Sequence, residues 1–244
     1  MSHHSSNEKI PYHIAIIPDG NRRWARKHGV DILKGHEKGI EKIGDLLKWC
    51  KEKDIRMVTM WGFSTENRNR TQQEVEGLMQ LFEKNLIEVL NRAEKEKGNE
   101  DKYPKVRVRF YGDIEDLPEK LVRYIREVER RTEKNDEYFV NFLLNYGGVP
   151  EIVDCFRKVL LDFKSGKIME INEEEIKKRL WTGEIPPPDL IIRTSGEMRL
   201  SGFMPLQSGY SELFFVDKYW PDFSREDFDK VITEYSLRER RFGR

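Results

Sequence analysis

The stretch HIAIIPDGNRRW, residues 13–24, predicts a buried strand that ends in a charged turn. Its first half is an unbroken apolar run, Ile14 to Ile17, which suits a strand covered on both faces, and a proline ends that run before a helical pattern begins. Asp19 would then lie at the carboxyl end of the strand, where ligands bind in parallel α/β sheets. Gly20 would let the backbone approach such a ligand closely.

The turn combines one carboxylate with several hydrogen-bond donors, because Asp19 is followed by Asn21, Arg22 and Arg23. A carboxylate does not bind phosphate directly. A divalent cation between Asp19 and a phosphorylated ligand is therefore the simplest interpretation, with the arginines holding the remaining charge. The alternative is an ordinary strand-to-helix turn that is capped by Asp19 or Asn21.

Length and composition limit the class of protein. The chain has 244 residues with 44 basic and 44 acidic side chains, so it lacks the basic excess of a nucleic-acid binder. No apolar run approaches the roughly 20 residues that span a bilayer, and no signal peptide precedes the first strand, which predicts a cytoplasmic protein. Cys50 and Cys155 have no metal-like spacing and are interpreted as buried thiols. Residues 1–10 are expected to be a disordered leader and residues 11–244 a single domain.

The rest of the chain alternates between strand and helix patterns, which predicts an α/β fold with an open, mostly parallel six-stranded sheet flanked by helices. Tyr138 to Asn145 is almost wholly apolar and is expected to be central. The predicted strands are 14–17, 56–61, 106–111, 138–145, 189–192 and 213–216. The predicted helices are 35–54, 75–90, 117–128, 150–163, 172–181 and one that begins at 225.

Polar clusters follow the strands of this predicted sheet: PDGNRRW, GFSTENRNR, NYGG and RTSGEMR. They contain arginines that would repel each other at one rim unless a dense anion such as a diphosphate lay among them. Ser195, Gly196 and Ser201 could add donors to an anion-binding nest. The alternative for any one arginine is a solvated surface charge. The arginines are Arg22, Arg23, Arg70, Arg193 and Arg199.

Other side chains near these clusters leave their roles open. His36 could donate to a phosphate or carry a proton, or it could be a capping or surface histidine. Trp24 and Phe63 suggest an apolar wall beside the phosphate, although single aromatic residues more often belong to the core. The chain has no Walker loop, no GxGxxG after its first strand, no GxSxG and no HExxH, so the common nucleotide, hydrolase and zinc chemistries lack their motifs.

Taken together, HIAIIPDGNRRW, GFSTENRNR, NYGG, IIRTSGEMRLS and GYSELFF resemble the motifs of the cis-prenyltransferases, in the same order along residues 13–217. The resemblance implies condensation of isopentenyl diphosphate with an allylic prenyl diphosphate, with a new cis double bond at each step. It implies Mg²⁺ as the cofactor. It also implies a protein at the cytoplasmic membrane surface, because the product is a lipid.

The resemblance implies a role for each matched residue. Asp19 would be the catalytic magnesium ligand and Glu212 a second ligand, while Asn67 would be the group assigned to proton removal. Arg241 and Gly243 match a C-terminal motif that completes a neighbour's active site, which implies a homodimer. The residues expected to bind the substrates are Gly20, Asn21, Arg22, Arg23, Trp24, His36, Ser64, Thr65, Glu66, Arg70, Arg193, Arg199, Leu200 and Ser201.

Some positions differ from the usual family pattern. Ile32 stands where the family usually has an arginine, so one positive charge is missing. Arg68 stands where an aromatic residue is usual, and it could bring that charge to the substrate from another direction. The other three differences are Val149, Gly202 and Leu206.

An apolar tunnel is expected to hold the growing chain, with Gly62 leaving room at its mouth. The alternative is that its apolar residues are simply core. Because Phe142 and Leu143 are bulkier than the residues usual before NYGG, we hypothesise a short or medium-length product. The candidate lining residues are Val75, Leu78, Met79, Phe82, Leu86, Phe139, Phe142 and Leu143.

Two other functions compete with this interpretation. A non-catalytic regulatory or binding subunit of such a complex would keep the fold without the turnover, but such subunits tend to lack the aspartate that this chain has at Asp19. A phosphohydrolase of doubly wound fold would release phosphate without any growth of a carbon chain.

Overall fold

The computed structural model describes residues 9–95 and 105–238, and the contacts within the chain divide it into two compact units. Unit 1 combines residues 1–58, 188–198 and 210–244, and unit 2 combines residues 59–187 and 199–209. The leader expected at residues 1–10 falls mostly outside the described residues. The single domain expected over 11–244 stays a prediction.

The strands form a six-stranded sheet in the order β3-β4-β2-β1-β5-β6. The registers of β1 with β5, β5 with β6, and β3 with β4 are parallel, so the predicted open, parallel α/β class is confirmed. The predicted strand at 56–61 is longer than expected, because its extended backbone continues to Ser64. The strands are β1 (His13–Ile17), β2 (Met57–Ser64), β3 (Val106–Tyr111), β4 (Tyr138–Tyr146), β5 (Leu190–Thr194) and β6 (Glu212–Val216).

The helices follow the predicted order, with different ends where capping residues decide. The second helix starts at Ile32 because the Asp31 side chain accepts a hydrogen bond from the Leu33 amide, and Asn172 caps the sixth helix as predicted. None of the helices in the described ranges is long and apolar enough to cross a membrane. The helices are α1 (Asn21–Lys27), α2 (Ile32–Glu52), α3 (Gln72–Lys95), α4 (Glu119–Thr132), α5 (Gly148–Lys164), α6 (Glu173–Lys177) and α7 (Arg225–Ser236).

Within residues 9–95 and 105–238, four short 3₁₀ helices connect these elements. Two of them follow the carboxyl ends of strands, where ligands bind in parallel sheets. The helix η1 follows β2 directly, and η5 follows the turn after β6. These 3₁₀ helices are η1 (Thr65–Asn69), η3 (Ile114–Asp116), η4 (Ser208–Tyr210) and η5 (Trp220–Asp222).

Unit 1 is built on the fully buried strands β1 and β5, and its register aligns Ile17 with Arg193. Helix α1 lies directly against α2, since a Cβ at Gly35 would lie 2.4 Å from the carbonyl oxygen of Asn21. The buried indole of Trp220 donates to the Gly39 carbonyl at 2.7 Å and fixes η5 on the same helix. The carboxyl ends of β1, β5 and β6 therefore share one edge of this unit.

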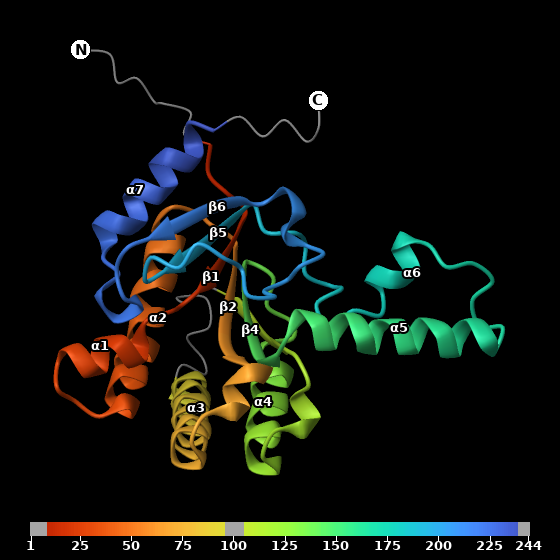
Figure 1. Cartoon of the computed structure of the whole chain (residues 1–244), viewed down its shortest axis with the longest axis horizontal. Coiled ribbons are helices and arrows are strands. Elements are labelled where there is room, and N and C mark those ends of the chain that lie inside the picture. Colours follow the sequence, from red (N-terminus) through yellow and green to blue (C-terminus); the bar gives the residue numbers. More distant parts are fainter. Residues whose placement is uncertain (1–8, 96–104, 239–244) are drawn as a thin grey trace. The chain divides into compact units, whose positions relative to one another are not determined.

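Unit 2 contains β3 and β4 together with helices α3, α4, α5 and α6. Helices α3 and α4 lie side by side (Figure 1), and α4 buries Leu121, Ile125 and Val128. Helices α5 and α6 are joined by an apolar cluster that includes Cys155. Arg179, just after α6, forms an ion pair with Asp162 of α5 at 2.7 Å. Cys155, like Cys50 in unit 1, is a buried free thiol, as the sequence predicted.

Substitution of Gly112, which follows β3, tests how closely the ends of β3 and β4 approach each other in unit 2. The φ of Gly112 is +139°, and a Cβ there would lie 1.9 Å from the Leu144 carbonyl oxygen. We expect Gly112→Ala to lower the free energy of unfolding by about 3 kcal/mol or more, measured by urea denaturation. Gly166→Ala is the matched control, because its φ of +72° is also left-handed but no atom lies within 4 Å of the added Cβ. It should cost about 1 kcal/mol, and equal losses would contradict the steric account.

Candidate active site

The turn after β1 is fixed by its backbone, which leaves the Asp19 carboxylate outside the capping of α1. The Asp19 carbonyl accepts hydrogen bonds from the Trp220 amide at 2.9 Å and from the Thr194 hydroxyl at 2.7 Å. The N-cap of α1 is Gly20, with φ at +105°, and no side chain caps the helix. The alternative of a turn capped by Asp19 or Asn21 is therefore wrong, because the left-handed glycine takes the capping position.

Two guanidinium groups hold the Asp19 carboxylate, one on each oxygen. Arg23, on α1, donates a hydrogen bond of 3.2 Å to Oδ1 of Asp19. Arg193, on β5, donates a hydrogen bond of 2.9 Å to Oδ2. Burial alone would raise the pKa of Asp19, but the hydrogen bond from Arg193 and the charges of Arg23 and Arg193 lower that pKa below its ordinary value. Asp19 is thus ionised at neutral pH, and it keeps a partly exposed side chain.

Arg23 connects the turn to the RTSGEMR segment. Its Nη1 donates to Glu197 at 2.8 Å and its Nη2 to the Ser195 hydroxyl at 2.5 Å. The backbone part of the expected anion nest is wrong at Ser195 and Gly196, since these amides donate to the carbonyl oxygens of Lys218 and Val216. Both residues have left-handed φ angles and extend the pairing with the chain after β6. Side chains, not these amides, therefore present the donors. The hydroxyl donors of Ser195 and Ser201 stay predictions.

The other unit 1 residues predicted to bind substrate surround this cluster. The Asn21 amide donates to the Pro18 carbonyl at 3.2 Å, which gives it a role in the turn itself. Trp24 stacks on His28 and donates its indole N–H to Asp222 at 2.7 Å. Arg22 is partly exposed on α1. Their substrate contacts stay predictions.

His36 and Glu212 are the two remaining unit 1 predictions. His36 is inside α2, which Asp31 caps, so His36 is not a capping residue. Glu212 pairs in register with Leu190 at the amino end of β5, and its carboxylate accepts from Arg238 at 2.7 Å. Since Asp19 follows the opposite end of β1, about 16 Å further along the strands, the two carboxylates do not form one metal site within the chain.

Two of the predicted clusters, GFSTENRNR and NYGG, meet in unit 2 together with the loop at Gly202. The convergence of all four clusters stays a prediction. Gly147 has no room for a side chain, because a Cβ would lie 2.4 Å from the Thr65 hydroxyl oxygen. Gly148 donates its amide to the Gly202 carbonyl at 3.0 Å. These contacts hold together the loop before α3, the NYGG turn and the RLSG loop. Gly202 contributes through its backbone carbonyl, so this contact does not need the asparagine side chain of the usual pattern.

Arg68 anchors the first of these loops and does not reach freely into solvent. Its Nε donates to Asn145 Oδ1 at 2.8 Å, and its Nη2 lies 2.6 Å from the Asp116 carboxylate. The same loop is closed by Asn67, whose Oδ1 accepts from the Ser64 amide at 3.3 Å. Arg68 therefore has a structural role, because its guanidinium ties η1 to the NYGG turn. Its expected contact with substrate stays a prediction.

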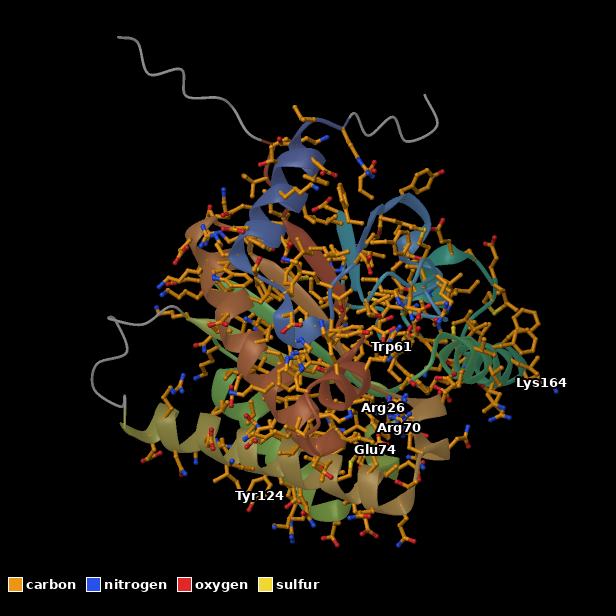
Figure 2. The ribbon with its side chains drawn as sticks, turned by 60° about the vertical axis from the view of Figure 1, so that its left-hand side comes forward. Arg26, Trp61, Arg70, Glu74, Tyr124 and Lys164 are labelled. Carbon is orange, nitrogen blue, oxygen red and sulfur yellow. The ribbon has the colours of Figure 1, made fainter. Side chains whose placement is uncertain are left out.

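The remaining unit 2 predictions have mixed outcomes. Arg70 pairs with the buried Glu74 at 3.1 Å at the start of α3 (Figure 2). Glu66, Arg199 and Ser201 are exposed and Leu200 is partly exposed, so these residues are accessible.

The two predictions about the tunnel also differ in outcome. Gly62 does not leave open space, because a Cβ there would meet a methyl group of Leu144 at 2.7 Å. The apolar tunnel stays a prediction.

Several residues of the unit 1 cluster were not singled out from the sequence: Thr194, Glu197, Tyr219 and Asp222. Glu197 lies within the RTSGEMR motif, and its position between two arginines could have indicated an ion-pair partner for an arginine of the site. Tyr219 and Asp222 follow β6, and the rule that ligand sites gather at the carboxyl ends of parallel strands could have found them. Arg241 and Gly243 lie outside the described residues.

Comparison with known proteins agrees with the fold and the motifs. Residues 17–243 match the family model described as putative undecaprenyl diphosphate synthase. An isoprenyl transferase of Thermotoga maritima is 46% identical over 235 residues, which cover 96% of this chain and 97% of the relative. A tritrans,polycis-undecaprenyl-diphosphate synthase (geranylgeranyl-diphosphate specific) of Pyrococcus horikoshii is 46% identical, covering 96% and 88%.

A solved structure supports the same conclusion. Lavandulyl diphosphate synthase from Lavandula x intermedia, in complex with dimethylallyl diphosphate, has a TM-score of 0.87 and 32% identity, covering 96% of this chain and 99% of that one. The chain belongs to the undecaprenyl diphosphate synthase family of cis-prenyltransferases. It is therefore a prenyltransferase whose substrates are prenyl diphosphates.

The lowered pKa of Asp19 gives a pH test of the cluster. Because the folded-state pKa lies below the unfolded one, the ion pairs stabilise the fold above the ordinary carboxyl value of about 4 and are lost as pH falls through the lowered pKa. We expect Asp19→Asn to reduce the free energy of unfolding by about 1 to 2 kcal/mol at pH 7. In urea titrations the difference should shrink toward zero in acid, where the wild-type carboxyl is also neutral.

The control for this test is Asp45→Asn, since Asp45 forms an exposed ion pair with Lys42. It should change stability by no more than a few tenths of a kcal/mol at either pH. A loss for Asp19→Asn that is the same at pH 7 and in acid would contradict the ionised carboxylate.

Proposed function

We propose that this chain condenses isopentenyl diphosphate with an allylic prenyl diphosphate in a magnesium-dependent reaction that extends a cis-polyprenyl chain. The observation that carries the proposal is the Asp19 carboxylate between Arg23 and Arg193 at the carboxyl end of β1. Ionisation of an allylic diphosphate develops negative charge on the leaving group. Guanidinium groups that are already held close to that place can stabilise this charge.

The residues of the cluster fit a magnesium ion that is shared with substrate. Mg²⁺ is usually bound through one or two carboxylates together with substrate phosphates and water, and Asp19 offers an ionised, partly exposed carboxylate. Among the described residues, no group of three or more His, Cys, Asp or Glu side chains forms an all-protein cation site. When bound, the ion would neutralise charge on the diphosphate.

Arg23 and Arg193 have different parts in this proposal. Arg193 is 5% exposed, so its charge is held in a poorly hydrated place beside Asp19. Arg23 is more exposed and already shares its N–H groups among three acceptors, Asp19, Glu197 and Ser195. We expect Arg23 to transfer donors to the diphosphate, because a phosphate oxygen can replace an exposed carboxylate partner more easily than a buried one.

Asn67 is proposed as the group that assists proton removal, on the basis of the family resemblance. Its side-chain oxygen is oriented by the Ser64 amide, and its loop is held by Arg68 on Asn145. These contacts support a fixed position for Asn67 during the reaction.

The proposal is tested by mass analysis of products from isopentenyl diphosphate with a panel of allylic primers, with and without Mg²⁺. We expect growth of the carbon chain in five-carbon steps that depends on Mg²⁺. Release of phosphate without chain growth would favour the phosphohydrolase, and absence of both reactions would favour the non-catalytic subunit.

Asp19→Asn in the same assay isolates the role of the carboxylate. The substitution keeps the size of the side chain but removes its charge, so we expect the rate of condensation to fall by about 10²- to 10³-fold. Asp45→Asn is again the control and should retain the wild-type rate. Comparable rates for both variants would contradict the assignment of Asp19.

Product length is the finer part of the proposal. We propose a product shorter than undecaprenyl diphosphate because of the bulk of Phe142 and Leu143, although the Pyrococcus horikoshii relative is named for an undecaprenyl product. Phe142 stacks on Phe110 with ring centroids 5.4 Å apart, which also gives its ring a packing role. Products of undecaprenyl length in the wild-type assay would overturn the shorter product.

The chain is further proposed to act as a homodimer that uses an exposed apolar surface on α5. Apolar side chains recur on this helix at spacings of three and four residues, which aligns them on one face. A row of exposed apolar side chains of this kind marks an interaction surface, and Phe156 is 64% exposed. We call this the α5 stripe: Val149, Ile152, Val153, Phe156, Leu160 and Phe163.

A charge on the α5 stripe should break the homodimer. We expect Phe156→Glu to give a monomer by light scattering at micromolar concentration, where the wild type is a dimer. Leu161→Glu is the matched control, because Leu161 is 67% exposed on the same helix but outside the stripe, and it should leave the dimer intact. A monomeric wild type, or the same outcome for both variants, would contradict this interface.

Contact with the membrane surface is proposed from the lipid nature of the product. An isoprenoid chain that is released into water exposes a large apolar area, so delivery to a bilayer is favoured.

A further inference from the structure

We propose that Tyr219, the residue before η5, is a positioning residue that keeps the Arg23 guanidinium aimed at the diphosphate site. This inference rests on the proposed function, because it assigns Tyr219 a part in binding the same substrate. It concerns a residue that the sequence motifs do not include.

Tyr219 lies directly against the turn that carries Asp19. A Cβ at Gly20 would lie 2.8 Å from Tyr219 Cδ1 and 3.0 Å from its Cα, so the glycine is what allows the ring to approach. The Arg23 guanidinium carbon is 5.7 Å from the centre of the Tyr219 ring, within the range of a cation–π contact. The ring thus contacts both the turn and its arginine.

The backbone on either side of the ring is fixed. The Trp220 amide donates to the Asp19 carbonyl at 2.9 Å, and the buried Trp220 indole donates to Gly39 at 2.7 Å. The Tyr219 carbonyl accepts from the Asp222 amide at 2.9 Å. Tyr219 is therefore held in place by the same hydrogen bonds that shape the Asp19 turn.

The contact with Tyr219 differs in kind from the other contacts of Arg23. Its partners Asp19, Glu197 and Ser195 are hydrogen-bond acceptors, and a diphosphate competes with them for the same N–H groups. The attraction of the ring for the guanidinium does not require a conventional hydrogen bond, so the ring can stay in contact while the N–H donors move to phosphate. Tyr219 then preserves the orientation of Arg23 during the exchange of partners.

Lys27 adds a second cation to the same ring. Its Nζ lies 6.0 Å from the ring centre, and it follows Arg23 by one helical turn on α1. Like charges at this spacing repel each other. The ring attracts both cations, which offsets part of this repulsion.

The test compares Tyr219→Leu with Tyr219→Phe in steady-state condensation. Leucine removes the ring, so we expect the KM for the allylic diphosphate to rise about two- to fivefold with a smaller change in kcat. Phenylalanine keeps the ring and should stay near the wild-type KM. A similar rise for both variants, or for neither, would overturn the proposal.

A double-mutant cycle separates positioning of Arg23 from a general loss of structure. In an Arg23→Ala background, Tyr219→Leu should cause no further rise in KM, because the group that the ring positions is absent. An undiminished rise in that background would overturn the proposal. Thermal unfolding of all variants identifies any rise that follows from loss of fold.

Failure of the proposed function can be told apart from failure of this inference. If the wild type does not extend an allylic primer, the proposed function fails, and the Tyr219 variants are then compared by calorimetric binding of inorganic pyrophosphate with Mg²⁺. Weaker binding by Tyr219→Leu alone supports positioning of Arg23. Equal affinities for the wild type and both variants would overturn it.

Discussion

The ion pairs of Asp19 with Arg23 and Arg193 are the interaction on which the account of this protein depends. They join the turn after β1 to β5, and they keep a carboxylate ionised beside two guanidinium groups. The geometry is possible because parallel strands bring their carboxyl ends to one edge and because Gly20 adopts a left-handed conformation. The cluster contains both signs of charge, which the proposed binding of a diphosphate with a cation would need.

Further residues, within each unit separately, hold the loops of the fold in place. Trp220 fixes the Asp19 carbonyl and, through its indole, the α2 helix. Arg68 ties η1 to the NYGG turn where the family pattern has an aromatic residue, so a departure from the pattern is compensated by a hydrogen bond to Asn145. Val149, another departure, lies on the exposed α5 stripe. These substitutions alter how the loops are held without removing the charged residues.

Much of the fold could be predicted because strand and helix patterns are local properties of the sequence. The strand at Val106–Tyr111 has the predicted bounds, and Asn172 caps its helix as predicted. The bounds of β2 and α2 differed because backbone extension to Ser64 and the Asp31 cap depend on contacts that periodicity does not encode. The approach of Asp19 to Arg193 could be predicted, because Asp19 follows β1 and Arg193 lies near the carboxyl end of β5. The carboxyl ends of parallel strands meet at one edge of a sheet.

What the sequence could not provide was how each polar group is used. The amides of Ser195 and Gly196 looked like anion donors, but pairing with the chain after β6 occupies them. Glu212 matched a motif, yet its strand register takes it to the opposite end from Asp19. The roles of Glu197 and Tyr219 depend on contacts between segments far apart in sequence, which no single motif contains.

The most direct test of the central claim is a crystal structure of the chain with inorganic pyrophosphate and Mn²⁺, which anomalous scattering locates in place of Mg²⁺. The account predicts the ion on the Asp19 carboxylate and pyrophosphate oxygens within hydrogen-bond distance of Arg23. Pyrophosphate bound away from this turn, with Asp19 still paired to both arginines and no ion beside it, would contradict the account.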